Sequence, residues 1–199
     1  MIKTKEDLNR YLKADYSKRF SGGIREYIAQ RPLWQFNLYL RKTEYHTNNA
    51  GIYHRFLGLW YRARLKSISM KLGWLVPPNT CGAGLYIVHP GTVVINNKAR
   101  IGKNARIHVC VNIGATKDGV PMIGDDVYIG PGAKIYGNIV LGDRVTIGAN
   151  AVVNRNFGND QLLVGIPASA KEKRTDLGAY KGTNFLKRTY FKSARPFHE

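Results

Sequence analysis

The stretch that decides the fold runs from Ile95 to Val153: INNKARIGKNARIHVCVNIGATKDGVPMIGDDVYIGPGAKIYGNIVLGDRVTIGANAVV. Aliphatic residues recur in it every six residues, with one exception. They stand at Ile95, Ile101, Ile107, Ile113, Ile123, Ile129, Ile135, Leu141, Ile147 and Val153. A period of six fits neither an α-helix nor a hairpin sheet, and a fixed repeat indicates a stacked architecture. The pattern therefore predicts a β-rich protein, a parallel β-helix whose hexapeptides form the flat faces of a triangular coil.

Small residues flank the repeated aliphatic position, as tight corners require. Glycine often follows it, at Gly102, Gly114, Gly124, Gly130, Gly142 and Gly148. Alanine often stands two residues before it, at Ala99, Ala105, Ala133 and Ala151. Glycine permits backbone angles that other residues resist. Chance spacing in a β-rich protein is the alternative, and the number of matching positions argues against it.

The exception is the step from Ile113 to Ile123, which is ten residues long instead of six. The four extra residues fall within ATKDGVPM and must leave the coil as a loop. A surface insertion without function is one interpretation. Loops on rigid scaffolds often carry function, so we expect this loop to overhang the active site.

The residues before the repeat predict helices. Short amphipathic helices are expected over residues 4–20 and 24–42, separated by Ser21-Gly22-Gly23. A third is expected over 51–72, with Pro77-Pro78 as the signal that stops it before the coil. The third helix places Ile52, Phe56, Leu59, Ala63 and Met70 on one stripe. Its neighbouring stripe, Arg55, Arg62 and Lys66, is either a solvated face or a membrane or polyanion contact.

Three parts follow along the chain. Residues 1–75 form the helical N-terminal region and 76–171 the catalytic β-helix, with LLVGIPASAK (162–171) as the turn that closes the coil. Residues 172–199 form a basic, aromatic C-terminal extension. It could wrap a neighbouring subunit, touch lipid headgroups or be poorly ordered.

The formal net charge of +18 is unevenly placed. Residues 1–75 carry 15 Lys and Arg against 5 acids, 76–170 carry 8 against 5, and 171–199 carry 8 against 3. A nucleic-acid-binding protein usually concentrates its positive charge on the main folded surface. Here the excess lies in the two ends of the chain, so we expect no nucleic-acid partner. Basic flanks instead suit an anionic membrane or a phosphorylated substrate. With no apolar leader and no 18-residue apolar run, we expect a cytoplasmic protein, peripheral at the inner membrane face.

Few residues in the repeat can carry chemistry. Acyl transfer to an alcohol needs a base, and histidine titrates near neutrality. His89 lies in GLYIVHPGTVVI, where the register becomes irregular, and His108 takes a position that is often glycine. Either histidine could also be structural. Cys81 and Cys110 lack CxxC spacing and an evident His/Asn constellation, so neither a zinc site nor a catalytic thiol is expected.

From about Pro77 to Lys171 the chain resembles the serine acetyltransferase branch of the hexapeptide acyltransferases. The carrying stretches are GLYIVHPGTVVIN, ARIGKNARIHVCVNIGAT, PMIGDDVYIGPGAKIYGNIVLGDRVTIGANAVV and VGIPASAK. The resemblance implies a left-handed β-helix, a homotrimer and His89 as general base. It also implies acetyl-CoA as co-substrate, without metal, in a groove between adjacent β-helices. By position, the expected acetyl-CoA contacts are Gly114, Ala115, Gly132, Ala149 and Lys171.

The chain departs from that branch at the acceptor. Val88 stands where the branch has aspartate, and TKDGVPM lacks its arginine-histidine pair. A free amino acid would lose two charge-assisted contacts. The chain therefore looks closer to the short bacterial O-acetyltransferases of capsule, lipopolysaccharide and exopolysaccharide.

This closeness predicts transfer of acetyl to a sugar hydroxyl of a surface polysaccharide or its precursor, monomeric, oligomeric or lipid-linked. The acceptor-side candidates are His108, Thr116 and Lys117. Two alternatives stay open: a serine O-acetyltransferase of cysteine biosynthesis, and a non-enzymatic β-helix scaffold that binds a partner or a polyanion.

Overall fold

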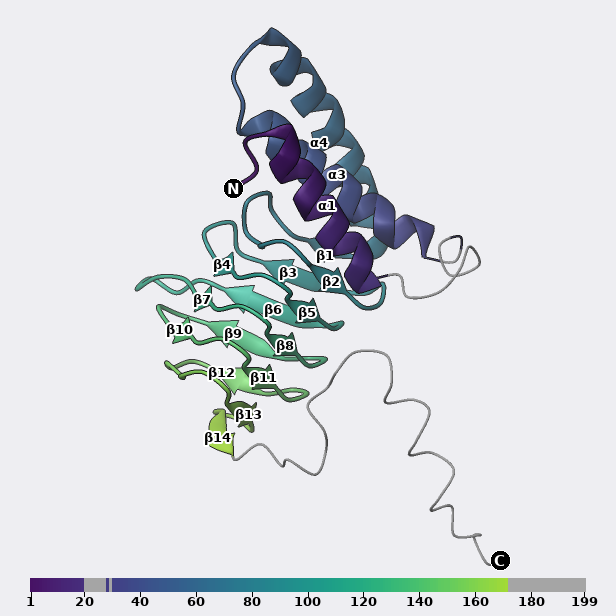
Figure 1. The fold of residues 1–199 in the computed structure, drawn as a ribbon. Coiled ribbons are helices and arrows are strands. Elements are labelled where there is room, and N and C mark those ends of the chain that lie inside the picture. Colours follow the sequence, from purple (N-terminus) through teal and green to yellow (C-terminus); the bar gives the residue numbers. More distant parts are fainter. Residues whose placement is uncertain (20–27, 29, 172–199) are drawn as a thin grey trace, which may run out of the picture.

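The computed structural model describes residues 1–19, 28 and 30–171. In this part of the chain, helices α1 (Lys5–Arg19), α3 (Arg31–Thr47) and α4 (Ile52–Leu72) pack together above a stack of short strands (Figure 1). Helix α3 continues five residues beyond the expected end at residue 42. The expected linker Ser21-Gly22-Gly23 and the C-terminal extension 172–199 lie outside the described residues.

The strands form three sheets, each one face of a triangular coil. Sheet A contains β1 (Trp74–Leu75), β3 (Val93–Ile95), β6 (Val111–Gly114), β9 (Lys134–Tyr136) and β12 (Val152–Val153). Sheet B contains β4 (Arg100–Ile101), β7 (Met122–Ile123) and β10 (Val140–Leu141). Sheet C contains β2 (Tyr86–Ile87), β5 (Arg106–Ile107), β8 (Tyr128–Ile129), β11 (Thr146–Ile147), β13 (Leu162–Val164) and β14 (Ser169–Lys171). Pairing is parallel except between β13 and β14. The predicted parallel β-helix is confirmed.

The repeated aliphatic residues fill the interior, as predicted. All ten between Ile95 and Val153 are at most 5% exposed, and they line up from coil to coil. Ala99, Ala105, Ala133 and Ala151 are fully buried where the coil turns. Each coil therefore buries the same apolar set as the next, which is how a solenoid builds one continuous core.

The three corners of the coil are named here by the sheets they join: C–A, A–B and B–C. On the B–C corner, Asn104, Asp126, Arg144 and Asp160 occupy equivalent positions with φ between 55° and 60°. Asparagine and aspartate tolerate this left-handed conformation better than most side chains. Neighbouring coils are also linked there, because the carboxylate of Asp125 accepts a hydrogen bond from the backbone N–H of Lys103 (2.7 Å).

The long step between Ile113 and Ile123 forms a loop on the A–B corner, as predicted. The backbone N–H of Thr116 donates to the carbonyl of Gly119 over 2.9 Å, which closes a tight turn. Residues 115–118 at its tip are exposed. In Figure 1 this loop projects beside β7, away from the edge where β2 and β5 lie.

Helix α4 ends at Leu72, as predicted, but Gly73 ends it rather than Pro77-Pro78. Gly73 adopts a left-handed conformation (φ 76°) and its backbone N–H bonds to the Ser69 carbonyl. Such a glycine ends many helices because it has no side chain to oppose that conformation. The next residues, Trp74 and Leu75, already pair with β3, so the chain enters sheet A before the prolines.

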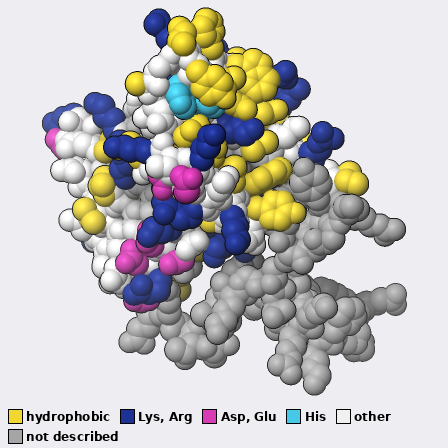
Figure 2. All heavy atoms as spheres, turned by 45° about the horizontal axis from the view of Figure 1, so that its top comes forward, with side chains coloured by type: hydrophobic (Ala, Val, Ile, Leu, Met, Phe, Trp, Pro, Cys, Tyr) yellow, Lys and Arg dark blue, Asp and Glu magenta, His cyan; other side chains and the backbone are white. Residues whose placement is uncertain are grey.

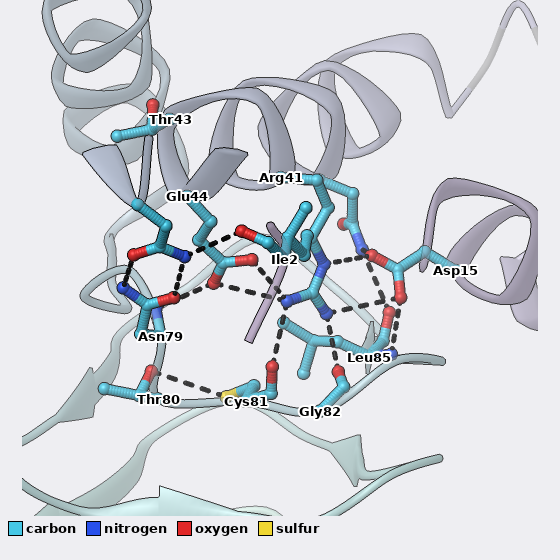
Figure 3. A network of polar contacts seen from close by, with 12 residues as sticks. Ile2, Asp15, Arg41, Thr43, Glu44, Asn79, Thr80, Cys81, Gly82 and Leu85 are labelled. Atoms are coloured by element: carbon cyan, nitrogen blue, oxygen red, sulfur yellow. Dashed lines mark hydrogen bonds and ion pairs between the residues drawn. The ribbon is translucent and has the colours of Figure 1, made fainter. Parts of the chain in front are cut away.

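A buried polar cluster, called here the cap cluster, joins the helices to the first coil (Figure 3). It consists of Asp15, Arg19, Asn37, Arg41 and Glu44, all at most 2% exposed. Arg41 forms ion pairs with both acids of the cluster and donates to the carbonyls of residues 81 and 82. The amide of Asn37 and the guanidinium of Arg19 donate to the carbonyls of residues 85 and 87. The open edge of the first coil is thereby hydrogen-bonded, which protects it from pairing with another strand.

Burial opposes the charge of Arg41, but the carboxylates of Asp15 and Glu44 outweigh burial and raise the pKa of the guanidinium. The ion pairs are 2.8 Å to Asp15 and 3.0 Å to Glu44. Asp15 also accepts hydrogen bonds from the backbone N–H groups of Gly84 and Leu85. The buried charge of Arg41 is therefore matched by two carboxylates.

The stripe predicted on the third helix does not face the core. The buried residues of α4 are Gly58, Leu65, Ile68 and Leu72, on the opposite side. Ile52, Phe56, Leu59 and Met70 are each at least 60% exposed. Helix α4 therefore has two apolar sides, and only one of them packs against α3 and the β-helix.

Candidate active site

His89 lies on the C–A corner of the first coil. Inward-pointing Ile87 and Ile95 are eight residues apart there, whereas the equivalent Ile107 and Ile113 one coil below are six apart. The two extra residues make the corner bulge, and the His89 side chain is exposed on it. Gly91 permits the bulge through its φ of 136°, a conformation that favours glycine. The irregular register predicted from the sequence is thus a corner that presents a histidine.

His108 occupies the same corner one coil below, with its ring centre 6.4 Å from that of His89. Its ring lies 5.1 Å from the ring centre of Tyr128. Burial, the positive charge of Arg106 and the proximity of His89 lower the pKa of His108 to about 4. His108 is therefore neutral at physiological pH, beside a histidine that is open to solvent.

Outward-facing side chains of sheet C extend this site. Tyr86, Arg106 and Tyr128 stand in register on successive coils. The guanidinium carbon of Arg106 lies 5.2 Å from the ring centre of Tyr86 and 6.0 Å from that of Tyr128. Stacking on aromatic rings holds a guanidinium in place. A positively charged group therefore lies next to the histidine pair.

Arg19 approaches the same tyrosine from the cap cluster. Its guanidinium carbon lies 5.2 Å from the ring centre of Tyr86, and one nitrogen donates to the carbonyl of Ile87 (3.2 Å). Burial lowers its pKa to about 10, so it stays charged at neutral pH. Within the described residues, its Nε and Nη1 have no hydrogen-bond partner. Two cations thus flank Tyr86.

Sequence reasoning missed Arg19, Tyr86, Arg106 and Tyr128. The six-residue register contained a signal for three of them. Tyr86, Arg106 and Tyr128 each precede an inward isoleucine on the face that carries the histidines, so they had to form one column. Arg19 gave no such signal, because the packing of α1 against the first coil is not encoded in the repeat.

The expected acetyl-CoA contacts fall on two different corners. Gly132 and Ala149 lie on the C–A corner, on the two coils that follow that of His108. Gly114, Ala115, Thr116 and Lys117 belong to the end of β6 and the loop on the A–B corner. Lys171 ends β14, at the far end of sheet C. One subunit therefore brings His89 together with Gly132 and Ala149, and separates it from the loop candidates.

The C–A corner is open below the histidines. Gly130 and Gly148 occupy the positions equivalent to His108 on the next two coils, so no side chain projects there. Gly132 has a φ of 77°, and a β-carbon on it would collide with the side chain of Asn150. Along this strip of the corner, Gly130 and Gly148 leave room for an extended ligand arm beside the exposed side chains of Ala149 and Asn150.

The departures noted in the sequence remain in the structure. Val88 is buried, with its backbone N–H bonded to the carbonyl of Ile107 (3.0 Å). Among residues 1–19, 28 and 30–171, no side chain hydrogen-bonds the His89 ring. The loop carries Lys117 and Asp118 as its charged residues.

The two cysteines differ in exposure. Cys81 is buried, and burial raises the pKa of its thiol to about 12, which excludes a thiolate nucleophile. Cys110 lies on the C–A corner, exposed and with a φ of 61°. In the described part of the chain no group of three or more potential ligands could hold a metal ion.

The chain folds as a left-handed parallel β-helix, and its residues 121–155 match the family described as "Bacterial transferase hexapeptide (six repeats)". The chain is 35% identical over 131 residues to the serine acetyltransferase of Synechococcus elongatus, covering 59% of this chain and 54% of that protein. It is 42% identical over 95 residues to the serine acetyltransferase of Staphylococcus xylosus, covering 46% and 44%. The chain thus spans about half the length of the curated relatives it matches.

Solved structures agree in fold. Soybean serine acetyltransferase complexed with serine superposes with a TM-score of 0.66 at 26% identity, over 82% of this chain and 69% of that one. These comparisons contradict the predicted sugar acceptor and the closeness to polysaccharide O-acetyltransferases. The relatives and the structure named above are serine acetyltransferases, and one of them holds serine. The absence of aspartate at Val88 and of arginine in the loop TKDGVPM was therefore a misleading guide to the acceptor.

Proposed function

We propose that this chain is an acetyl-CoA-dependent O-acetyltransferase whose acceptor is the hydroxyl of L-serine. The observation that carries the proposal is the exposed His89 on the bulged C–A corner, above a strip that Gly130 and Gly148 leave open. The similarity to serine acetyltransferases over 95 to 131 residues supports the choice of acceptor.

His89 acts as general base. Its neutral imidazole takes the proton of the serine hydroxyl as the oxygen attacks the thioester carbonyl carbon. Backbone N–H groups stabilise the negative charge that develops on the carbonyl oxygen. The C–S bond then breaks, and the imidazolium returns its proton to the departing thiolate. The ring is thereby regenerated, and the products are O-acetylserine and CoA.

The donor site is completed by a second subunit. The strip below His89 lies on the C–A corner and the loop with Thr116 and Lys117 on the A–B corner of the same chain. Symmetric oligomers are usually closed, so we place the C–A corner of one chain against the A–B corner of the next in a homotrimer. In that arrangement the loop candidates, Gly114 and Ala115 reach the acetyl-CoA that Gly132 and Ala149 line from the other side.

Arg106 supplies the guanidinium that the loop lacks. Its guanidinium is held between Tyr86 and Tyr128, next to the histidine pair. A guanidinium binds a carboxylate with two parallel hydrogen bonds. Serine held there by its carboxylate presents its hydroxyl toward His89. The neutral ring of His108, next to those of His89 and Tyr128, does not repel the substrate ammonium group.

The test is CoA release from acetyl-CoA with and without L-serine, with O-acetylserine identified by mass spectrometry. His89→Ala should lower kcat by about 10² to 10⁴, the usual contribution of a general base. His54→Ala is the matched control, because His54 lies in α4 away from the β-helix corner, and it should leave the rate unchanged. Serine-independent release in the wild type, or a fully active His89→Ala, would contradict the proposal.

The carboxylate contact has its own readout. Arg106→Gln should raise KM for L-serine about ten-fold or more and leave KM for L-serine methyl ester unchanged, because the ester has no carboxylate to lose. An equal effect on both acceptors would show that Arg106 is structural. Equal KM values for the acid and the ester in the wild type would rule out carboxylate recognition altogether.

A further inference from the structure

Helix α4 exposes a large apolar surface on the side that faces away from the core. Ile52, Tyr53, Phe56, Leu59 and Trp60 are between 47% and 69% exposed, and Met70 continues the stripe at 76%. These residues recur at helical spacing, so they share one side. Monomeric soluble proteins rarely leave several large apolar side chains together in water. This surface, called here the α4 face, is therefore suited to a partner.

Positive charge borders the α4 face on both sides. At about 100° per residue, Arg55, Arg62 and Lys66 fall on one edge of the stripe, and Arg64 and Lys71 on the other. All five are exposed. The 21 residues of α4 contain no Asp or Glu. Figure 2 shows hydrophobic side chains gathered at the helical end of the molecule, with Lys and Arg around them.

The charge decides between two kinds of occupant. A second copy that pairs symmetrically through the α4 face would bring ten cations together without a compensating acid from α4. An anionic surface would neutralise them. A strong apolar side bordered by Lys and Arg, with Trp and Phe in it, is the pattern of helices that lie in the plane of a membrane interface.

The position of α4 allows such contact. Its first half lies farthest from the β-helix, because α4 joins β1 at its other end (Figure 1). The five large apolar residues between 52 and 60 are all in that half. No helix in the described residues is long and apolar enough to cross a membrane, so the contact would be peripheral.

We propose that the α4 face binds the surface of an anionic phospholipid bilayer, with Phe56, Leu59 and Trp60 inserted among the headgroups and the flanking cations on the phosphates. This property is separate from acetyl transfer. It places the active-site corner of the β-helix on the side of the molecule that faces the aqueous phase.

The experiment is co-sedimentation of the full-length protein with vesicles of phosphatidylcholine, with and without phosphatidylglycerol. The wild type should bind only the anionic vesicles, and binding should weaken as salt rises. Phe56→Ser/Leu59→Ser and Arg55→Gln/Arg62→Gln should each weaken binding at least about ten-fold. Val140→Ser removes an equally exposed apolar side chain from β10 and should leave binding unchanged. Transfer of acetyl to serine in solution should stay at the wild-type rate in all three variants.

Four results would overturn the proposal. The first is no binding to anionic vesicles. The second is equal binding to neutral ones. The third is full binding by both α4 variants, which would assign it to other basic residues. The fourth is that the protein does not bind vesicles and that the mass measured by sedimentation is half as large in Phe56→Ser/Leu59→Ser as in the wild type. The α4 face would then join two copies of the protein.

Discussion

Arg41→Met tests how strongly the cap cluster holds the helices to the β-helix. Methionine has a similar length and no charge, so the change removes the hydrogen bonds with little change in volume. Arg41 is fully buried and bonds Asp15, Glu44 and the carbonyls of residues 81 and 82 at distances between 2.6 and 3.3 Å. After the change, two buried carboxylates and two carbonyls lose a partner at once.

The expected loss can be worked from these contacts. Breaking a buried ion pair by removing one partner costs about 3 to 5 kcal/mol. Each orphaned carbonyl adds about 1 to 3 kcal/mol at most, and less where water enters. Because Asp15 can still accept from two backbone N–H groups, we expect a total near 5 kcal/mol. Whole domains are stable by about 5 to 15 kcal/mol, so the helices should separate from the coil before the β-helix unfolds.

Urea unfolding followed by two signals measures this. Circular dichroism at 222 nm reports the helices. Trp74 reports the junction in a Trp34→Phe/Trp60→Phe background, because its buried ring lies 4.9 Å from Phe36. The wild type should lose both signals together, and Arg41→Met should lose them at much lower urea. Hydrogen exchange at the amides of residues 84 and 85 should accelerate in parallel.

Arg144→Met is the matched control. Arg144 also forms an ion pair with a carboxylate, that of Asp160 at 2.7 Å, but both side chains are more than half exposed. Exposed pairs contribute little. The reasoning fails if Arg41→Met unfolds at the wild-type urea concentration, or if both arginine variants lose the same stability.

Three further predictions concern the corner that carries the histidines. Saturating acetyl-CoA should slow alkylation of Cys110 by N-ethylmaleimide, because this exposed thiol lies on the C–A corner. Buried Cys81 should not react with or without ligand. An unchanged rate at Cys110 would show that acetyl-CoA binds elsewhere. His108 should titrate by NMR near pH 4, and its pKa should rise toward the ordinary value of 6.5 in Arg106→Gln. Between about pH 6.5 and pH 4 the unfolded chain binds a proton at this histidine and the native chain does not. The free energy of unfolding should therefore fall as the pH is lowered through this range. A midpoint at 6.5 in the wild type would refute this. Gly132→Val should lower the free energy of unfolding by about 1 to 3 kcal/mol, because a β-carbon at this φ of 77° collides with the next coil; wild-type stability in thermal or urea unfolding would show that the corner relaxes.

The repeat could be predicted from the sequence because each coil uses the same local rule. An inward aliphatic every six residues decides register, face and corner together, and the interruption after Ile113 could only be a loop. The same register would have placed Tyr86, Arg106 and Tyr128 in one column, had it been extended to the outward positions.

The helical region follows no such rule, which is why its prediction was weaker. The apolar stripe through Phe56 and Leu59 looked like a core-facing side, yet the buried side is the one through Leu65 and Ile68. Both sides have helical spacing, and only the packing partner distinguishes them. The meeting of Asp15 and Arg41 with the backbone of residues 81–85 spans too much sequence for any local pattern.

The acceptor was misjudged for a related reason. Val88 and the loop showed which charged partners are missing, but a missing contact does not say what replaces it. In the proposed function the replacement is Arg106, which stands two residues before His108 and one coil away from Val88. Such a substitution across coils is invisible when positions are compared one at a time.

The two closures of the stack have a consequence for its evolution and for its engineering. A solenoid grows by adding identical layers, and its number of layers is limited by what terminates each end. Here one terminus is a charged plug made by α1 and α3, and the other is the reversed strand β14. Neither depends on how many layers lie between them. A coil could therefore be inserted or deleted below Asn150 while the helical cap and β14 stay intact. The length of the β-helix could then be changed without rebuilding either end.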